Sequence, residues 1–153
     1  MEKIASFKIN HDMLTRGLYI SRIDGDVVTY DLRMKLPNGE DYLAPAVAHT
    51  LEHLLATYLR NSEIGNEVVY VGPMGCRTGF YILLRDTVSP EAAIVEIYAA
   101  LCVAANYMGD IPGATRAECG NYRDHDLVGA RIEARKMLPI LRMWTKGQLK
   151  YPE

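Results

Sequence analysis

The sequence predicts an α+β domain in which an antiparallel sheet packs against helices. One stretch alternates apolar and polar residues as a half-buried strand does, and two further apolar runs are joined by a glycine-rich turn, as in a hairpin. Two longer apolar segments without internal Gly or Pro are typical of helices. No repeat, low-complexity tract or linker divides the 153 residues, so we expect a single domain over residues 1–153.

The first predicted strand lies in VVTYDLRMKL, residues 27–36. Its apolar positions, which we expect to face the core, are Val28, Tyr30, Leu32 and Met34. The polar positions that alternate with them are Thr29, Asp31 and Arg33. Arg33 is therefore expected on the polar face. Two more strands are predicted in NEVVYVG, residues 66–72, and TGFYILLRDTV, residues 78–88, which connect through GPMGCRTG.

Two helices are expected in the second half of the chain. In SPEAAIVEIYAALCVAANYMG, Ser89 can cap the helix, Pro90 suits the first helical position and Glu91 complements the helix dipole. A further helix is expected over about residues 126–138. It should end before Pro139, because proline has no amide hydrogen to donate.

The composition argues against nucleic acid and membranes as partners. A net charge of -2, with 24% charged and 49% hydrophobic residues, is typical of an average soluble protein. Basic residues near the end are diluted by Glu133 and apolar positions, so we expect a solvated helix face and no phosphate-binding block. The start, MEKIASFKIN, lacks the apolar region of a signal peptide, and no run reaches the roughly 18 apolar residues of a membrane span. We therefore expect a cytosolic protein.

The stretch HTLEHLLA contains His49, Glu52 and His53 in a predicted helix that begins at Pro45. Positions i, i+3 and i+4 share one helix face, so the three side chains point the same way. A lone histidine there is usually a hydrogen-bonded core residue. A histidine pair with an acid, however, needs partners that a metal ion supplies at once. H-x-x-E-H is also a metallohydrolase signature, so we expect a metal at this helix.

A third protein ligand is needed, and the three cysteines are the candidates, because an odd number in a reducing compartment argues against a disulfide framework. Cys102 lies between Leu and Val on a predicted helix and is expected in the core. Cys119 precedes Gly120 in a polar, irregular stretch and is either a ligand or a surface cysteine. Cys76, in GPMGCRTGF, fits an active site, an ordinary tight turn, or the fourth ligand of a closed His2Cys2 structural zinc.

Several motifs together resemble one family. HTLEHLLA, GPMGCRTGFY and ECG followed by HDL, with ASFKINH and YDLRMKLPN, resemble S-ribosylhomocysteine lyase, the bacterial enzyme that makes the precursor of autoinducer-2. The resemblance runs over nearly the whole chain. It implies cleavage of a thioether to homocysteine and 4,5-dihydroxy-2,3-pentanedione, with roles in quorum sensing and the methyl cycle.

By this resemblance, His49, His53 and Cys119 are the ligands of one divalent metal ion per subunit. The ion in the family is ferrous iron in the cell, often replaced by zinc on isolation. Glu52 and Cys76 are implied as the acid–base pair. Residues 1–153 would then form a single metalloenzyme domain.

The resemblance also implies a homodimer with active sites at the subunit interface. Ser6, His11 and Arg33 match family residues that line the substrate pocket, and the first two reach across the interface. The chain departs from the family pattern at residues 70–72, Tyr-Val-Gly, where relatives often have Asp-Ile-Ser. The acidic residue expected near the amino-acid end of the substrate is therefore absent.

The implied chemistry suits these residue types. Releasing sulfur without redox chemistry requires two enolisations that move the sugar carbonyl until the sulfur lies β to a ketone. A divalent metal stabilises the negative charge that develops on oxygen. Glu52 and Cys76 would move the protons, since a thiolate near a cation can take a proton from carbon. Arg33 and the metal would supply that positive field.

Two alternatives from other classes remain open. A zinc metallopeptidase would use the same H-x-x-E-H element, with Glu52 activating water, but it needs a downstream acidic ligand where this chain offers a cysteine. A non-catalytic His2Cys2 zinc module would use both Cys76 and Cys119 as ligands.

Overall fold

A computed structural model describes residues 1–153 as one four-stranded sheet with three α-helices and three short 3-10 helices. The strands are β1 (Gly17–Asp24), β2 (Val27–Arg33), β3 (Val68–Pro73) and β4 (Gly79–Arg85). The α-helices are α1 (Pro45–Asn61), α2 (Pro90–Asn106) and α3 (Leu127–Leu141). The 3-10 helices are η1 (Ala5–Phe7), η2 (Gly65–Glu67) and η3 (Lys146–Leu149). The predicted α+β class with an antiparallel sheet is confirmed.

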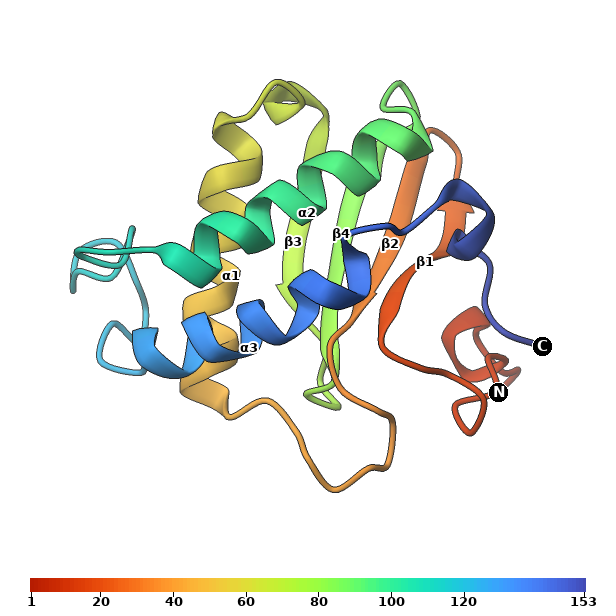
Figure 1. The fold of residues 1–153 in the computed structure, drawn as a ribbon, viewed down its shortest axis with the longest axis horizontal. Coiled ribbons are helices and arrows are strands. Elements are labelled where there is room, and N and C mark those ends of the chain that lie inside the picture. The colour runs from red at the N-terminus through yellow and green to blue at the C-terminus, as the bar shows by residue number, and fades with distance from the viewer.

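The strands lie in the order β1-β2-β4-β3, and every neighbouring pair is antiparallel. Figure 1 shows the helices gathered on one side of the sheet, with both chain termini beyond β1. On the helix-facing side, Leu32 pairs with Phe80 and Tyr30 with Ile82, and all four side chains are buried in one core with residues of α1, α2 and α3. This face is the apolar one that the alternation in β2 predicts.

The opposite face of the sheet is polar, as predicted, but it is also buried. Asp31 pairs with Tyr19 on β1 and with Tyr81 on β4, and Asp31 and Arg33 are only 0% and 1% exposed. Tyr151, near the C-terminus, covers this face by stacking on Tyr19 with ring centroids 5.2 Å apart. The alternation of apolar and polar residues therefore predicted which face each side chain occupies. That the polar face is covered depends on the C-terminal segment.

Several strand boundaries differ from the predicted ones: the strands predicted over residues 66–72 and 78–88 span Val68–Pro73 and Gly79–Arg85. No strand was predicted over residues 17–24, where the structure has β1. β2 ends at Arg33, three residues before the predicted end. There the amides of Met34 and Lys35 both donate to the carbonyl of Thr78, so the regular ladder stops.

The predicted helix starts are confirmed, and one predicted helix end is wrong. α1 begins at Pro45, and the Ser89 side chain caps α2 by accepting a hydrogen bond from the amide of Ala92. α3 continues through Pro139 and ends at Leu141. Proline removes one hydrogen bond, but it does so in the last turn, and burial of Leu141 in the core favours that extra turn. No helix combines the length and the apolar character needed to cross a membrane.

Candidate metal centre and cysteine pocket

Four side chains form a group with metal-binding geometry, which we call the histidine cluster: His49, His53, Cys119 and His125. One ligand atom from each lies within 4.8 Å of the others. His49 and His53 share a face of α1, whereas Cys119 and His125 lie in the segment that joins α2 to α3. Sγ of Cys119 is 3.4 Å from Nε2 of His49 and 4.0 Å from Nε2 of His53. The predicted helix pair and the loop cysteine therefore meet.

Backbone carbonyls orient both helix histidines. Nδ1 of His49 donates to the carbonyl of Asp124 at 2.7 Å, and Nδ1 of His53 donates to the carbonyl of Pro112, also at 2.7 Å. A carbonyl can only accept, so each Nδ1 carries the proton and each Nε2 keeps a free lone pair toward Cys119. Gly113 makes the second contact possible: its φ is +71°, and a Cβ there would lie 3.2 Å from Nδ1 of His53.

His125 has the same arrangement of one anchored and one free nitrogen. The hydroxyl of Thr50 donates its only proton to the carbonyl of Ala46, so it accepts from Nδ1 of His125 at 3.0 Å. Nε2 of His125 is buried and has no hydrogen-bond partner. Burial, together with the neighbouring His49 and His53, lowers the pKa of His125 and keeps its ring neutral.

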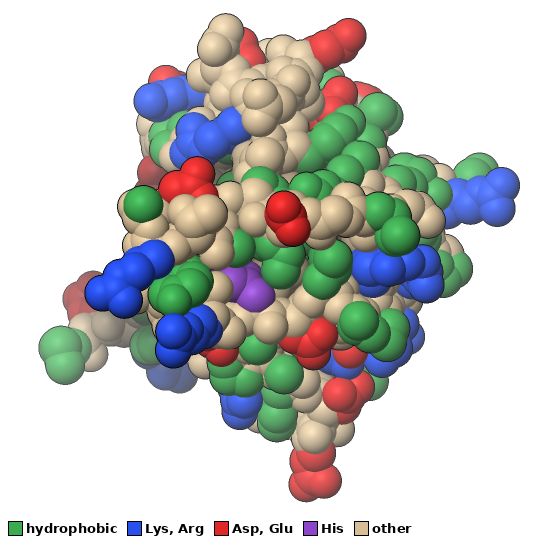
Figure 2. All heavy atoms as spheres, turned by 90° about the vertical axis from the view of Figure 1, so that its left-hand side faces the viewer, with side chains coloured by type: hydrophobic (Ala, Val, Ile, Leu, Met, Phe, Trp, Pro, Cys, Tyr) green, Lys and Arg blue, Asp and Glu red, His purple; other side chains and the backbone are tan.

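This donor set fits a divalent metal ion. Two imidazoles with free Nε2 lone pairs and one cysteine sulfur are ligands that both zinc and iron accept. The unpartnered nitrogen of His125 also fits a cation-binding site, because buried polar atoms normally have a partner. Figure 2 shows histidine side chains set back among the surrounding side chains but visible at the molecular surface.

Glu52 lies next to the histidine cluster on α1 and is half-buried. It takes part in none of the ion pairs of the chain. A carboxylate without a basic partner beside a metal site is free to accept and return protons. Glu52, the predicted acid–base carboxylate, therefore lies beside the histidine cluster without an ion-pair partner.

A second region, which we call the cysteine pocket, is a cavity of about 330 Å³. Its lining residues are Ser6, Phe7, His11, Arg33, Pro73, Met74, Gly75, Cys76 and Tyr81. The pocket brings together the three predicted substrate-binding residues and the predicted catalytic cysteine within one chain. No member of the histidine cluster lines it.

A buried ion pair between Arg33 and Asp31 lies at the wall of the cysteine pocket. Arg33 donates to both oxygens of Asp31, from Nε at 3.1 Å and from Nη2 at 2.6 Å, and the hydroxyl of Tyr151 donates to Oδ2 of Asp31 at 2.7 Å. Burial lowers the pKa of Arg33, but the Asp31 carboxylate more than offsets this, so the net shift is upward and the guanidinium stays charged. Burial first, and then Asp31, raises the pKa of Tyr151 far above its ordinary value.

Cys76 is exposed in the turn between β3 and β4, which is closed by a hydrogen bond from the amide of Arg77 to the carbonyl of Met74. Arg77 holds a positive φ of 60° in this turn. Sγ of Cys76 lies 3.0 Å from Oγ1 of Thr78, which also accepts a hydrogen bond from Nη1 of Arg33 at 2.8 Å. The turn therefore presents the sulfur to solvent while connecting it to the buried guanidinium.

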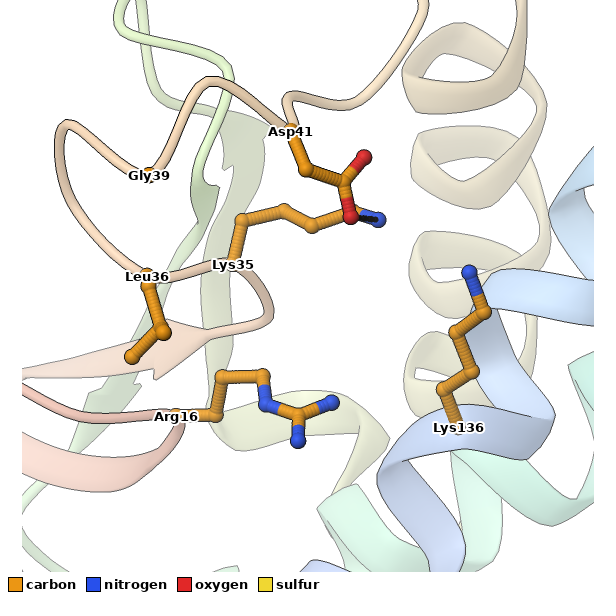
Figure 3. Close-up of a pocket in the computed structure, with 6 residues that line it drawn as sticks. All are labelled: Arg16, Lys35, Leu36, Gly39, Asp41 and Lys136. Carbon is orange, nitrogen blue, oxygen red and sulfur yellow. Dashed lines mark hydrogen bonds and ion pairs between the residues drawn. The ribbon is translucent and has the colours of Figure 1, made fainter.

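A separate cavity, of about 320 Å³, is shown in Figure 3. It lies where Arg16, Lys35 and Lys136 come together, and Lys35 pairs with Asp41 at 2.9 Å and with Glu133 at 3.0 Å. These ion pairs connect the segment before α1 to α3. The cavity is lined by no histidine or cysteine, so it offers neither a soft metal ligand nor a thiol nucleophile.

Sequence reasoning missed His125, Thr78 and Tyr151. His125 carries a local signal, since it follows Cys119 by six residues in the same polar segment. The structure brings His125, and not Cys76, to the two helix histidines and Cys119, so the grouping required by a His2Cys2 zinc module does not form within the chain. Cys102 lies on α2 as predicted but is only half-buried.

Comparison with known proteins identifies relatives of the whole chain. The family model described as S-ribosylhomocysteinase (LuxS) matches residues 4–147. The S-ribosylhomocysteine lyase of Borrelia garinii subsp. bavariensis is 45% identical, over 99% of this chain and 100% of the relative. The enzyme of the same name from Finegoldia magna is 45% identical over the full length of both chains, and that of Phocaeicola vulgatus is 44% identical over 99% of this chain and 98% of the relative.

Proposed function

The chain belongs to the S-ribosylhomocysteine lyase family, and from that premise we propose that it cleaves the thioether of S-ribosylhomocysteine. The products are homocysteine and 4,5-dihydroxy-2,3-pentanedione, the precursor of autoinducer-2, which places the enzyme in quorum sensing and the methyl cycle. The observation that carries the proposal is the histidine cluster, whose free ligand atoms converge beside an unpaired Glu52.

His49, His53 and Cys119 hold the metal in this proposal, one divalent ion per subunit. We take the ion to be ferrous iron in the cell, with zinc accepted by the same ligands. When bound, such an ion supplies a Lewis acid that stabilises negative charge on the sugar oxygens during enolisation. Three protein ligands leave one position open for substrate, and His125 faces the same space without being needed to fill the set.

Glu52 and Cys76 carry the protons. The carboxylate of Glu52, held on α1 between the two metal-binding histidines, accepts a proton from one sugar carbon or oxygen and returns it to the neighbouring atom. Cys76 acts as a thiolate that takes a proton from carbon and becomes a thiol. After the second enolisation, one of these bases takes the proton from the carbon next to the ketone as the carbon–sulfur bond breaks by β-elimination, and that proton passes to the departing sulfur of homocysteine.

In this proposal, the cysteine pocket binds the remaining groups of the substrate. Ser6, His11 and Arg33 offer a hydroxyl, an imidazole and a guanidinium to the sugar and amino-acid ends. Nδ1 of His11 donates to the carbonyl of Ile9, which leaves Nε2 as the acceptor. Tyr70 stands where relatives often have an acid, and its ring lies over Gly72, where a Cβ would overlap it.

A homodimer completes the active site. The chemistry needs Glu52 and Cys76 at one sugar, but the cysteine pocket contains no member of the histidine cluster. A second copy therefore supplies one half, and Arg33 and Cys76 join Ser6 and His11 as its contribution to the neighbouring site. Apolar side chains near the N-terminus remain exposed for an interface to cover: Ile4, Phe7 and Met13.

The other proposed properties follow from the same groups. The two cysteines must stay reduced to act, so we assign the enzyme to the cytosol. A metallopeptidase would need an acidic third ligand, and the histidine cluster offers Cys119 and His125 instead.

One assay tests the reaction class. Incubation of the purified protein with S-ribosylhomocysteine should release free homocysteine thiol, and the absence of any release from the metal-loaded protein would reject the proposal. Light scattering should give a mass of about twice 17.2 kDa. An active monomer would reject the shared site without rejecting the lyase reaction.

A further inference from the structure

Cys76 has a single side-chain hydrogen-bond partner in the chain, the hydroxyl of Thr78. Thr78 is 2% exposed, so water does not compete for that hydroxyl. Its oxygen lies 2.8 Å from Nη1 of Arg33 on one side and 3.0 Å from Sγ of Cys76 on the other. The threonine thus stands between the buried cation and the exposed sulfur.

The direction of these hydrogen bonds is fixed by the donors. A guanidinium can only donate, so Thr78 accepts from Arg33 and its own proton is left for the sulfur. Arg33 cannot turn away, because Asp31 holds both its Nε and Nη2. A hydroxyl polarised by a cation is a stronger donor, and hydrogen bonds to an ionised acceptor are the strong ones.

We propose that Thr78 is a positioning residue for the lyase reaction, and that its hydroxyl transmits the charge of Arg33 to Cys76. The hydroxyl donates to the thiolate, which stabilises the anion and fixes its lone pair toward the cysteine pocket. When the thiolate takes a proton from substrate carbon, the S–H bond forms as the C–H bond breaks, and no other reactant is required. The inference rests on the proposed role of Cys76, but it concerns the reactivity of the sulfur itself.

Alkylation of Cys76 by iodoacetamide tests this without substrate. The full-length, metal-loaded dimer is treated at pH 7, and the rate at Cys76 is followed by peptide mass spectrometry. Thr78→Ser and Thr78→Ala form the matched pair, because both lose the methyl group and only one loses the hydroxyl. We expect Thr78→Ala to react about tenfold more slowly than Thr78→Ser, the size of effect expected for losing a hydrogen bond to a charged group.

Two further measurements separate positioning from packing. Thr29→Val, at another buried threonine of the sheet with no hydrogen bond to Arg33 or Cys76, should leave the alkylation rate unchanged. In the lyase assay, Thr78→Ala should lower kcat with little change in KM, and Thr78→Ser should restore it. Equal alkylation rates for Thr78→Ser and Thr78→Ala would overturn the proposal even if the lyase activity is confirmed. A tenfold difference in alkylation rate in a protein that releases no homocysteine would instead support the role of Thr78 and reject the lyase reaction.

Discussion

His49 and His53 in the histidine cluster and Cys76 in the cysteine pocket are held in place by different kinds of contact. In the histidine cluster, the backbone carbonyls of Asp124 and Pro112 accept hydrogen bonds from Nδ1 of His49 and His53. In the cysteine pocket, the contacts run between side chains, from Arg33 through Thr78 to Cys76.

The difference indicates which charge each region can stabilise. Carbonyl acceptors fix imidazoles in the form whose free lone pairs attract a cation. A guanidinium and a hydroxyl present protons, which stabilise an anion. The proposed thioether cleavage needs both, a cation for the developing oxygen charge and a thiolate to accept protons, and the residues that we assign to these two roles lie in separate regions of the chain.

The largest expected effect is at the histidine cluster. His49→Ala, His53→Ala and Cys119→Ala should each lose bound metal and nearly all lyase activity, because a three-ligand site does not tolerate removal of a ligand. Elemental analysis of the purified variants measures the metal. His11→Ala, in the cysteine pocket, is the control and should keep it. A full equivalent of metal in Cys119→Ala would show that the third ligand is a different residue.

Changes to the proton-moving residues should leave the metal and remove the reaction. Cys76→Ala and Glu52→Gln are expected to retain metal while homocysteine release falls by roughly 100- to 10,000-fold, the usual range for loss of a general base. Solvent proton exchange at the sugar carbons should differ between the two variants, because they block different transfers. Metal loss from Cys76→Ala would favour a closed His2Cys2 site, and near-wild-type turnover would remove Cys76 from the mechanism.

Mixing these two inactive variants tests whether the regions meet across subunits. If each active site takes its histidine cluster from one chain and its cysteine pocket from the other, a mixed dimer has one site with both residues intact. Random re-association of equal amounts should restore about one quarter of the wild-type activity, as the symmetry of an isologous dimer requires. Co-expression with two different tags gives the mixed dimer directly. No recovery would place both residues of a working site in the same chain.

A smaller effect is expected at His125. His125→Ala should weaken metal binding by about tenfold, as residues that support metal ligands usually do, while the ion still binds with full stoichiometry. Competition with a chelator measures the affinity. Loss of stoichiometric metal would make His125 a ligand equal to Cys119.

The smallest expected effect concerns the contribution of Tyr151 to the stability of the fold. Tyr151→Phe removes a partly buried hydrogen bond to Asp31 and should lower the free energy of unfolding by about 1–3 kcal/mol. The pKa of Tyr151 is raised in the folded chain, so its contribution is fully present below pH of about 10 and is lost as the pH rises further. Urea unfolding at neutral and alkaline pH compares the two proteins, and a Tyr151→Phe variant as alkali-sensitive as wild type would contradict this assignment.

Local patterns in the sequence were sufficient to predict the residues that each region takes from a single helix or strand. The spacing of His49 and His53 and the helix start at Pro45 place two ligands on one face of α1. The alternation in β2 places Arg33 on the face away from the helices. These features repeat with the period of the helix or strand, so a short segment determines them.

The partners of those residues were decided only by the tertiary structure. His125 reaches His49 across 76 positions of chain, and Tyr151 reaches Asp31 across 120, and neither distance leaves a periodic signal. Alternation could not show that the polar face of the sheet is buried, because burial depends on the C-terminal segment that folds over it. The sequence by itself therefore determined which groups are present and which way each one points. Long-range packing decided which of them meet, since such contacts are specified by the whole core and by no single segment.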